Sequence, residues 1–242
     1  MKNLDIRDKF SGFYDKLIRC IYPKYCPLCN KIIPLNEDYC ACTRMDSIRI
    51  SDNHCHHCGH NIGFCVCSGQ NSIPLPNFTG VYLYSGKIRA DILNLKFNNE
   101  KRLAIKLGTE MAERCANVFC DIDFDIITFV PMTKKSLEKR TYNQSQLLAR
   151  QVGKLLFVPV EDLFEKTRDT RTQFGLTGDE RVQNLKDSVK LKTDIPLKGK
   201  NILICDDVKT TGATLDQCIR ALKDCGADKI CCITVAVSQF SV

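Results

Sequence analysis

The apolar positions along the chain predict alternating strands and helices over its C-terminal two-thirds. Short runs rich in β-branched and aromatic residues indicate buried strands, whereas apolar residues spaced three and four apart indicate helices. Strands are expected over residues 78–84, 124–130, 158–160, 202–205 and 230–237, and helices over 88–97, 102–118, 143–156 and 215–225. Strands that alternate with helices are typical of an α/β fold, a parallel sheet with crossover connections and helices on both faces.

The N-terminal third has a different pattern. Residues 4–21 carry apolar side chains at helical spacing, and their polar positions mix both charge signs, which favours docking onto a neighbouring element over membrane contact. Residues 68–77 are polar and turn-rich, with two prolines, and are interpreted as a linker. We therefore predict two domains, over residues 1–72 and 78–242.

The most informative stretch of the chain covers residues 201–214. It begins as a buried parallel strand, and Asp206 and Asp207 follow where that strand should end. Small and hydroxyl-bearing residues come next, just before a helix, whose first turn offers unpaired N–H groups at the positive end of its dipole. Gly212 lets the backbone approach an anion because it has no Cβ. A phosphate seat beside two carboxylates that can accept from ribose hydroxyls predicts a sugar-phosphate site.

This interpretation gives the residues of the stretch candidate roles. Phosphate contacts are expected from Lys209, Thr210, Thr211, Gly212, Ala213 and Thr214. Both carboxylates should face the ligand, so their replacement by asparagine should change the stability of the unliganded protein by no more than about 0.5 kcal/mol. The alternative is an ordinary strand, turn and capped helix, but the order of four apolar, two acidic and then Thr-Thr-Gly-x-Thr positions is narrower than that.

Polar and basic residues concentrate between Pro131 and Arg181, where apolar periodicity is weak. Thr133, Lys134 and Arg140 follow the predicted strand over 124–130, and parallel sheets bind ligands at the carboxyl ends of their strands. Beside a sugar-phosphate site, this long loop is suited to act as a lid or a pyrophosphate clamp. On composition alone it is equally a solvated surface loop.

Cysteine is the unusual residue type, with 16 residues, of which nine fall between Cys20 and Cys67. Four closely spaced pairs resemble zinc knuckles, and clustered pairs favour metal over disulfide bonds in a reducing compartment. Sequential pairing gives two zinc sites of four thiolates each, one from Cys26, Cys29, Cys40 and Cys42 and one from Cys55, Cys58, Cys65 and Cys67. An interleaved pairing of the same thiols is the alternative.

All four histidines lie around the second cysteine set, at His54, His56, His57 and His60. Eight thiols make them superfluous as zinc ligands, so we expect solvated loop positions. No histidine is available as a base from the C-terminal two-thirds of the chain.

Composition indicates an ordinary folded protein, with 44% hydrophobic and 26% charged residues. The net charge of +7 suits anionic ligands, including nucleic acid, without requiring them. No apolar run approaches the roughly 20 residues that span a bilayer. The N-terminus carries charges where a signal peptide would have its hydrophobic core, so a cytoplasmic location is expected.

The ordered set of motifs resembles the competence protein F (ComF) family of phosphoribosyltransferase-like proteins, from Cys26 to about Val237. The motifs are the paired cysteines, Tyr84-x-Gly86-x-Ile88-Arg89 with Leu95-Lys96-Phe97, Val130-Pro131, Arg140-x-x-Asn143-Gln144, Thr170-x-x-Gln173, Arg181-x-x-Asn184 and the stretch over 201–214. Two features depart from the family pattern. The family usually has Arg-Gly-Phe-Asn-Gln where this chain has Arg-Thr-Tyr-Asn-Gln, and the second cysteine pair of each set is C-x-C rather than C-x2-C.

The resemblance implies a type I phosphoribosyltransferase fold with an N-terminal zinc ribbon. In that fold the Thr210–Thr214 loop holds the 5-phosphate of phosphoribosyl pyrophosphate (PRPP), Asp206 and Asp207 take the ribose hydroxyls, and Mg²⁺ is bound with the pyrophosphate. The implied activity is phosphoribosyl transfer to an acceptor that the motifs do not specify, linked to DNA uptake in natural transformation. Two alternatives stay open: a PRPP-sensing accessory protein without transfer, and a protein that handles single-stranded DNA with the DNA-uptake machinery.

Overall fold

The computed structural model describes residues 47–62, 75–166, 188–192 and 195–238, together with the single positions Ile32, Cys65 and Cys67. Three features predicted from the sequence lie outside the described residues: the helix over 4–21, the first cysteine set and the motifs within 167–187. The cysteines of that first set are Cys26, Cys29, Cys40 and Cys42.

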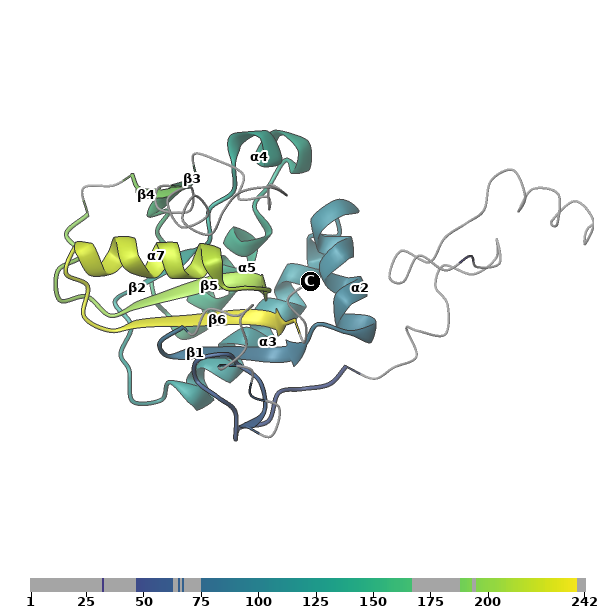
Figure 1. The fold of residues 1–242 in the computed structure, drawn as a ribbon. Coiled ribbons are helices and arrows are strands. Elements are labelled where there is room, and N and C mark those ends of the chain that lie inside the picture. The colour runs from purple at the N-terminus through teal and green to yellow at the C-terminus, as the bar shows by residue number, and fades with distance from the viewer. Residues whose placement is uncertain are drawn as a thin grey trace, which may run out of the picture.

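Within the described residues, four parallel strands form the central sheet, in the order β1-β6-β5-β2 (Figure 1). Their bounds are Phe78–Leu83 for β1, Ile126–Phe129 for β2, Ile202–Lys209 for β5 and Ile230–Val237 for β6. The inner strand β6 is buried at all of its positions, as expected where helices cover both faces of a parallel sheet. The predicted parallel α/β sheet is confirmed.

Helices cover both faces of this sheet (Figure 1). On one face lie α2 (Gly86–Phe97), α3 (Arg102–Val118) and α5 (Gln144–Leu156), and on the other lies α7 (Ala213–Asp224). The strand period of two separates the two cores. Leu203 and Cys205 of β5 pack with α3 and α5, whereas Ile202 and Ile204 pack with α7.

Local sequence explains where the two long helices run. The bounds of α3 match the helix predicted over 102–118, because Leu107, Met111 and Cys115 recur every four residues and are all buried. α5 begins after Asn143, whose Oδ1 accepts a hydrogen bond from the Ser145 N–H at 2.9 Å and so caps the helix.

β5 is longer than the sequence predicts. Its apolar run ends at Cys205, but strand pairing continues to Lys209, with Asp206 opposite Thr234 and Val208 opposite Ala236. The prediction that the strand ends before the acidic pair is therefore wrong. Main-chain hydrogen bonds to β6 extend the strand whatever the polarity of its side chains. The strand predicted over 158–160 is reduced to one bridge, between Val160 and Ile127.

The polar segment after β2 is also more regular than predicted. Lys134–Arg140 forms a short helix, α4, where the sequence suggested a loop, and the Thr133 Oγ1 caps it by accepting from the Ser136 N–H at 3.3 Å. β3 (Phe164–Lys166) and β4 (Val189–Leu191) pair in antiparallel fashion, and a bridge joins Lys166 to Thr133. α4, β3 and β4 lie on the same side of the sheet in Figure 1.

Residues 47–62 are attached to the core at β1 and α3. The Ile50 N–H donates to the Val81 carbonyl at 3.0 Å, which places this segment beside the edge of β1. The buried Arg114 of α3 reaches the same segment, because its Nη1 donates to Asp52 at 2.6 Å and its Nη2 donates to the Ser51 carbonyl at 2.8 Å. The domain boundary between residues 72 and 78 stays a prediction, but Leu75, within the predicted linker, is fully buried.

No helix in the described part of the chain is both long enough and apolar enough to cross a membrane. The cytoplasmic location stays a prediction.

Candidate functional site

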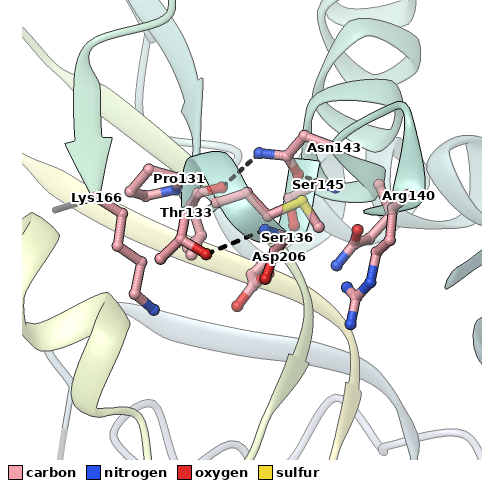
Figure 2. A pocket seen from close by; sticks show the side chains of 11 residues that line it. Pro131, Thr133, Ser136, Arg140, Asn143, Ser145, Lys166 and Asp206 are labelled. Atoms are coloured by element: carbon pink, nitrogen blue, oxygen red, sulfur yellow. Dashed lines mark hydrogen bonds between the residues drawn. The ribbon is translucent and has the colours of Figure 1, made fainter. Parts of the chain in front are cut away.

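A pocket of about 190 Å³ lies where the carboxyl ends of β2 and β5 meet. Parallel sheets place their ligand sites at this edge, because the connecting loops diverge there. The lining comes from the loop after β2, from α4, from the start of α5, from β3 and from β5. It consists of Val130, Pro131, Met132, Thr133, Ser136, Arg140, Asn143, Gln144, Ser145, Lys166 and Asp206. In Figure 2 the carboxylate of Asp206 lies between the cationic side chains of Lys166 and Arg140.

Asp206 is the carboxylate that faces this pocket. The Ser145 hydroxyl donates to its Oδ1 at 2.7 Å, and the Asp207 N–H donates to the same oxygen at 2.8 Å. Burial, followed by the charge of Asp207, raises the pKa of Asp206 to about 7. Its charge therefore depends strongly on what else enters the pocket near neutral pH.

Asp207 is placed quite differently. Its side chain is 5% exposed, and its Oδ2 lies 2.6 Å from the Nζ of Lys96, whose side chain is 19% exposed. Burial lowers the pKa of Lys96, but the charge and hydrogen bond of Asp207 outweigh this and raise it. Asp207 is not among the residues that line the pocket, so the geometry brings only Asp206 of the acidic pair to it, and the contact of Asp207 with a ligand and the tolerance expected of their joint replacement stay predictions. Successive residues of a strand point to opposite faces, and α2 supplies Asp207 with a buried partner.

The Thr210–Thr214 loop follows the same strand end. Gly212 adopts a left-handed conformation, with φ of +87°, and is the residue that precedes α7. A side chain there would be strained. The Thr211 Oγ1 accepts from the Ala213 N–H at 3.3 Å, and the first N–H groups of any helix point outward from its N-terminus. The loop therefore has the backbone and dipole that a phosphate requires.

Of the three ligand-binding residues predicted after β2, two line the pocket and one does not. Thr133 and Arg140 line the pocket with Asp206, and the Arg140 guanidinium also lies 4.8 Å from the ring centre of Phe97. Lys134 points elsewhere, since its side chain is 87% exposed and its Nζ lies 3.7 Å from Glu165.

Lys209 is also turned away from the pocket that Asp206 lines. It is the last residue of β5, it is 1% exposed, and its Nζ lies 5.5 Å from the ring centre of Phe78. This placement does not support a phosphate contact by the side chain, whereas the backbone of Lys209 leads directly into the Thr210–Thr214 loop.

Sequence reasoning missed three residues around Asp206 and Asp207. Ser145 and Lys166 carry no local signal, because they reach the site only through the start of α5 and the bridge from β3 to Thr133. Lys96 lies in the Leu-Lys-Phe motif, which marked the position without giving it a role. A lone lysine at the end of an otherwise apolar helix face would have been the available signal.

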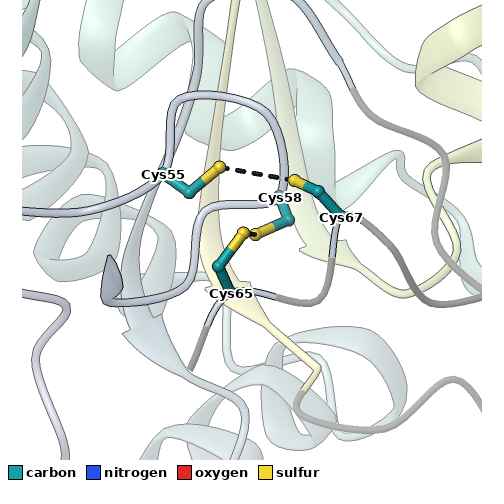
Figure 3. A group of neighbouring side chains, drawn as sticks. All are labelled: Cys55, Cys58, Cys65 and Cys67. Atoms are coloured by element: carbon teal, nitrogen blue, oxygen red, sulfur yellow. Dashed lines mark hydrogen bonds between the residues drawn. The ribbon is translucent and has the colours of Figure 1, made fainter. Parts of the chain in front are cut away.

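A second cluster is formed by four thiols. The Sγ atoms of Cys55, Cys58, Cys65 and Cys67 all lie within 4.8 Å of one another and point to a common centre (Figure 3). Two of the separations are 3.4 Å and 3.7 Å, against about 3.8 Å between the sulfurs of a tetrahedral zinc site with 2.3 Å bonds. Burial raises the pKa of Cys55, but hydrogen bonds from the Cys58 and His57 N–H groups lower it to about 6 overall. These residues fit a metal ion, and their pairing agrees with the sequential alternative.

The prediction that the histidines are solvated is wrong for two of them. His54 and His60 are 3% and 4% exposed. The Arg114 Nη2 donates to the His54 Nδ1 at 2.9 Å, and the His60 Nε2 donates to the Ser238 carbonyl at 3.2 Å. Both partners lie far along the chain, so no local pattern could have predicted them. His56 and His57 are exposed.

Comparison with known proteins gives the site a family. Residues 108–239 match the family model described as "Phosphoribosyl transferase domain". The "DNA utilization protein YhgH" of Escherichia coli is 28% identical over 218 residues, which cover 85% of this chain and 93% of that protein. The "Competence protein ComFC" of Bacillus subtilis is 23% identical over 216 residues, covering 86% and 84%. "Competence protein F" of Haemophilus influenzae is 33% identical over 105 residues, which cover 42% of this chain and 45% of that protein.

Solved structures are more distant. A purine phosphoribosyltransferase from Pyrococcus horikoshii is 20% identical, with a TM-score of 0.34, over 55% of this chain and 72% of that one. At this level the likeness adds nothing to the family match, which spans more than half of the sequence. With its four-stranded parallel sheet, its clustered cysteines and these relatives, the chain belongs to the phosphoribosyltransferase family, as a phosphoribosyltransferase-like protein of the competence protein F type.

Proposed function

We propose that this chain binds PRPP at the carboxyl edge of β2 and β5 and transfers the phosphoribosyl group to an acceptor, with release of pyrophosphate. The observation that carries the proposal is the position of Asp206. Its carboxylate faces a pocket flanked by Arg140 and Lys166, and the Thr210–Thr214 loop follows on the same strand. A carboxylate, two cations and a helix N-terminus at one edge match the hydroxyls, the pyrophosphate and the 5-phosphate of PRPP.

Each group has a role in this proposal. The Thr210–Thr214 loop and the first turn of α7 hold the 5-phosphate, and Asp206 accepts from the ribose hydroxyls. Arg140 and Lys166 carry positive charge toward the departing pyrophosphate, which stabilises charge that develops on it in the transition state. Lys96 neutralises Asp207, so that of the acidic pair Asp206 alone presents its charge to the ligand. Mg²⁺ bound with the pyrophosphate would supply further charge neutralisation.

The reaction is a substitution at the anomeric carbon of the ribose. The bond from that carbon to the pyrophosphate oxygen breaks and the oxygen keeps the electron pair, while a lone pair of the acceptor forms the new bond. Incubating the protein with PRPP, Mg²⁺ and a panel of nucleobases and amines tests the proposal, with acceptor-dependent pyrophosphate release as the expected result. PRPP binding without release for any acceptor would leave the PRPP-sensing alternative, and no PRPP binding would remove the proposal.

A second function, contact with single-stranded DNA, is supported by the surface of α4 and by the names of two relatives. Lys134, Lys135 and Lys139 are all exposed on this helix, next to the pocket. The Escherichia coli and Bacillus subtilis relatives are a "DNA utilization protein" and a "Competence protein". A basic helix of this kind would grip phosphates without reading base sequence.

The salt dependence of binding tests this contact. Replacing Lys134, Lys135 and Lys139 by glutamine should make the slope of log K against log salt less negative by about 2 units, because each lost phosphate contact on a single strand contributes about 0.7. The matched control replaces three exposed lysines by glutamine at the other end of the strands, away from the ligand site. They are Lys198, Lys223 and Lys229. Equal slopes for the two triple variants, measured by fluorescence anisotropy on a labelled oligonucleotide, would remove α4 as the contact.

We also propose that the metal is zinc and that the chain holds two ions. Elemental analysis of the purified protein should find two zinc ions per chain. Cys58→Ser should lose one of them, since Cys58 belongs to the described cluster and is fully buried. Cys225→Ser, which changes an exposed cysteine outside the cluster, should keep both. One zinc ion in the unmodified protein would contradict the site predicted at Cys26, Cys29, Cys40 and Cys42, and an unchanged count in Cys58→Ser would contradict the described one.

A further inference from the structure

We propose that Lys209 couples the metal centre to the phosphate loop. In this proposal the buried Lys209 ammonium is the cationic partner of the cluster of Cys55, Cys58, Cys65 and Cys67. Lys209 is also the last residue of β5, so its backbone positions the start of the Thr210–Thr214 loop. Metal in the cluster and PRPP at the loop should then strengthen each other's binding. The coupling rests on the proposed function, whereas the charge partnership of Lys209 with the metal does not.

The first support is the packing between Lys209 and residues 55–60, which we call the cysteine knuckle. The Lys209 Nζ lies 5.5 Å from the ring centre of Phe78, and both side chains are fully or almost fully buried. On the knuckle side the ring lies so close to Gly59 that a Cβ there would be 2.3 Å from the Phe78 Cε1. Gly59 follows Cys58 directly, so Phe78 is wedged against both Lys209 and the knuckle.

The second support is a set of hydrogen bonds, two between backbone groups and one from the His60 side chain, that join the segment around Cys55 and Cys58 to the ends of β1, β5 and β6. The Phe78 N–H donates to the His56 carbonyl at 2.8 Å. The His60 Nε2 donates to the Ser238 carbonyl at 3.2 Å, and the Ser238 N–H donates to the Lys209 carbonyl at 2.9 Å. A shift of the knuckle is therefore transmitted to the residue from which the phosphate loop starts.

The third support is charge. Four thiolates around a divalent cation carry a net charge of −2, and one of the four, Cys58, is buried. An opposite charge near that buried side of the cluster offsets the cost of keeping charge away from water. Burial lowers the pKa of Lys209, and the charges of Cys58, Cys67 and Cys55 oppose that effect. The cluster is thus within electrostatic reach of Lys209.

These contacts place Lys209 between the proposed metal ion and the proposed PRPP site. A filled cluster fixes the Lys209 side chain and, with it, the backbone that leads into Thr210. Without metal, weak thiol hydrogen bonds such as those between Cys55 and Cys67 and between Cys58 and Cys65 hold the cluster in place of metal bonds, so the segment that packs on Phe78 is held less firmly. Coupling between two sites is reciprocal, so PRPP should retain the metal as strongly as the metal favours PRPP, typically by a factor of about 5–150.

The first arm of the test measures zinc affinity by competition with a chromogenic chelator, in the full chain. In Lys209→Met, which keeps a long side chain but removes the charge, one zinc equivalent should bind at least tenfold more weakly than in the unmodified protein. The other equivalent should be unchanged and serves as an internal reference. Lys229→Met, at an exposed position before β6, is the matched control. Equal zinc affinity in the two variants would overturn the charge partnership.

The second arm measures the rate of zinc loss from the loaded protein to excess chelator, with and without PRPP. PRPP should slow the loss of one zinc ion at least fivefold in the unmodified protein and in Lys229→Met, and should leave the rate unchanged in Lys209→Met. A lysine that merely fills space would not make the PRPP effect depend on its charge. PRPP that binds by calorimetry but leaves zinc loss unchanged overturns the coupling while the proposed function stands. If PRPP does not bind, both the coupling and the proposed function are removed. The zinc affinities of the first arm then test the charge partnership of Lys209 by themselves.

Discussion

Replacing Lys96 by methionine is expected to lower the free energy of unfolding by about 3–5 kcal/mol. The change leaves the carboxylate of Asp207, whose side chain is only 5% exposed, without the ammonium that lies 2.6 Å from it. An uncompensated buried charge costs far more than the ion pair itself contributes, because the desolvation of the remaining partner is no longer offset. Denaturant unfolding of the unliganded protein measures the effect.

Two further variants separate this charge effect from other consequences of the change. Lys87→Met alters a lysine on the same helix, α2, whose side chain is 58% exposed and lies 3.6 Å from Asp91, so it should cost less than about 1 kcal/mol. The double variant Lys96→Met with Asp207→Asn removes both charges and should recover much of the lost stability. Equal costs for Lys96→Met and Lys87→Met would show that Asp207 does not depend on its partner.

The second large effect is expected on ligand binding. At a PRPP concentration about one hundred times its Kd, with Mg²⁺, the unmodified protein should gain about 2.7 kcal/mol of stability. Asp206→Asn keeps a side-chain oxygen that can accept from Ser145 and from the Asp207 N–H, so its unliganded stability should change little. Charged hydrogen bonds are worth about 1.5–3 kcal/mol, and an affinity loss of about a hundredfold would reduce the gain to about 0.4 kcal/mol.

The measurement is best made at pH 8. Since the pKa of Asp206 is raised to about 7, the carboxylate is largely ionised there and the difference from asparagine is greatest. Asp228→Asn, at an exposed carboxylate before β6, is the control and should gain as much as the unmodified protein. If Asp206→Asn gained as much as Asp228→Asn, the carboxylate would not contact PRPP. If the unmodified protein gained nothing, PRPP would not be its ligand.

The sequence predicts the fold well where a single helix or strand carries its own signal. α3 and β6 match the predicted ranges because apolar residues repeat at the helical period in one and run continuously in the other. The end of β5 was misplaced, since pairing with β6 and not the polarity of Asp206 and Asp207 decides where the strand stops. α4 was missed because it buries none of its residues, so it has no apolar periodicity to detect.

The site was predictable where its residues are close in sequence. The acidic pair and the Thr210–Thr214 loop form one contiguous stretch, and Thr133 and Arg140 follow the neighbouring strand. The different environments of the two carboxylates could not be predicted, because Ser145 and Lys96 reach them from α5 and α2. The same holds for His54 and His60, which are buried by partners far along the chain.

Arg114 has a consequence for the newly made chain. It lies 62 residues after Asp52, and its guanidinium donates hydrogen bonds to Asp52, Ser51 and His54. At a synthesis rate of about 5–20 residues per second, the segment around Cys55 and Cys58 leaves the ribosome about 3–12 s before Arg114 is available to anchor it. During that interval its thiols have neither the α3 anchor nor the sheet behind them. Metal captured at this stage would protect the cysteines from oxidation before the domain that later packs against this segment exists.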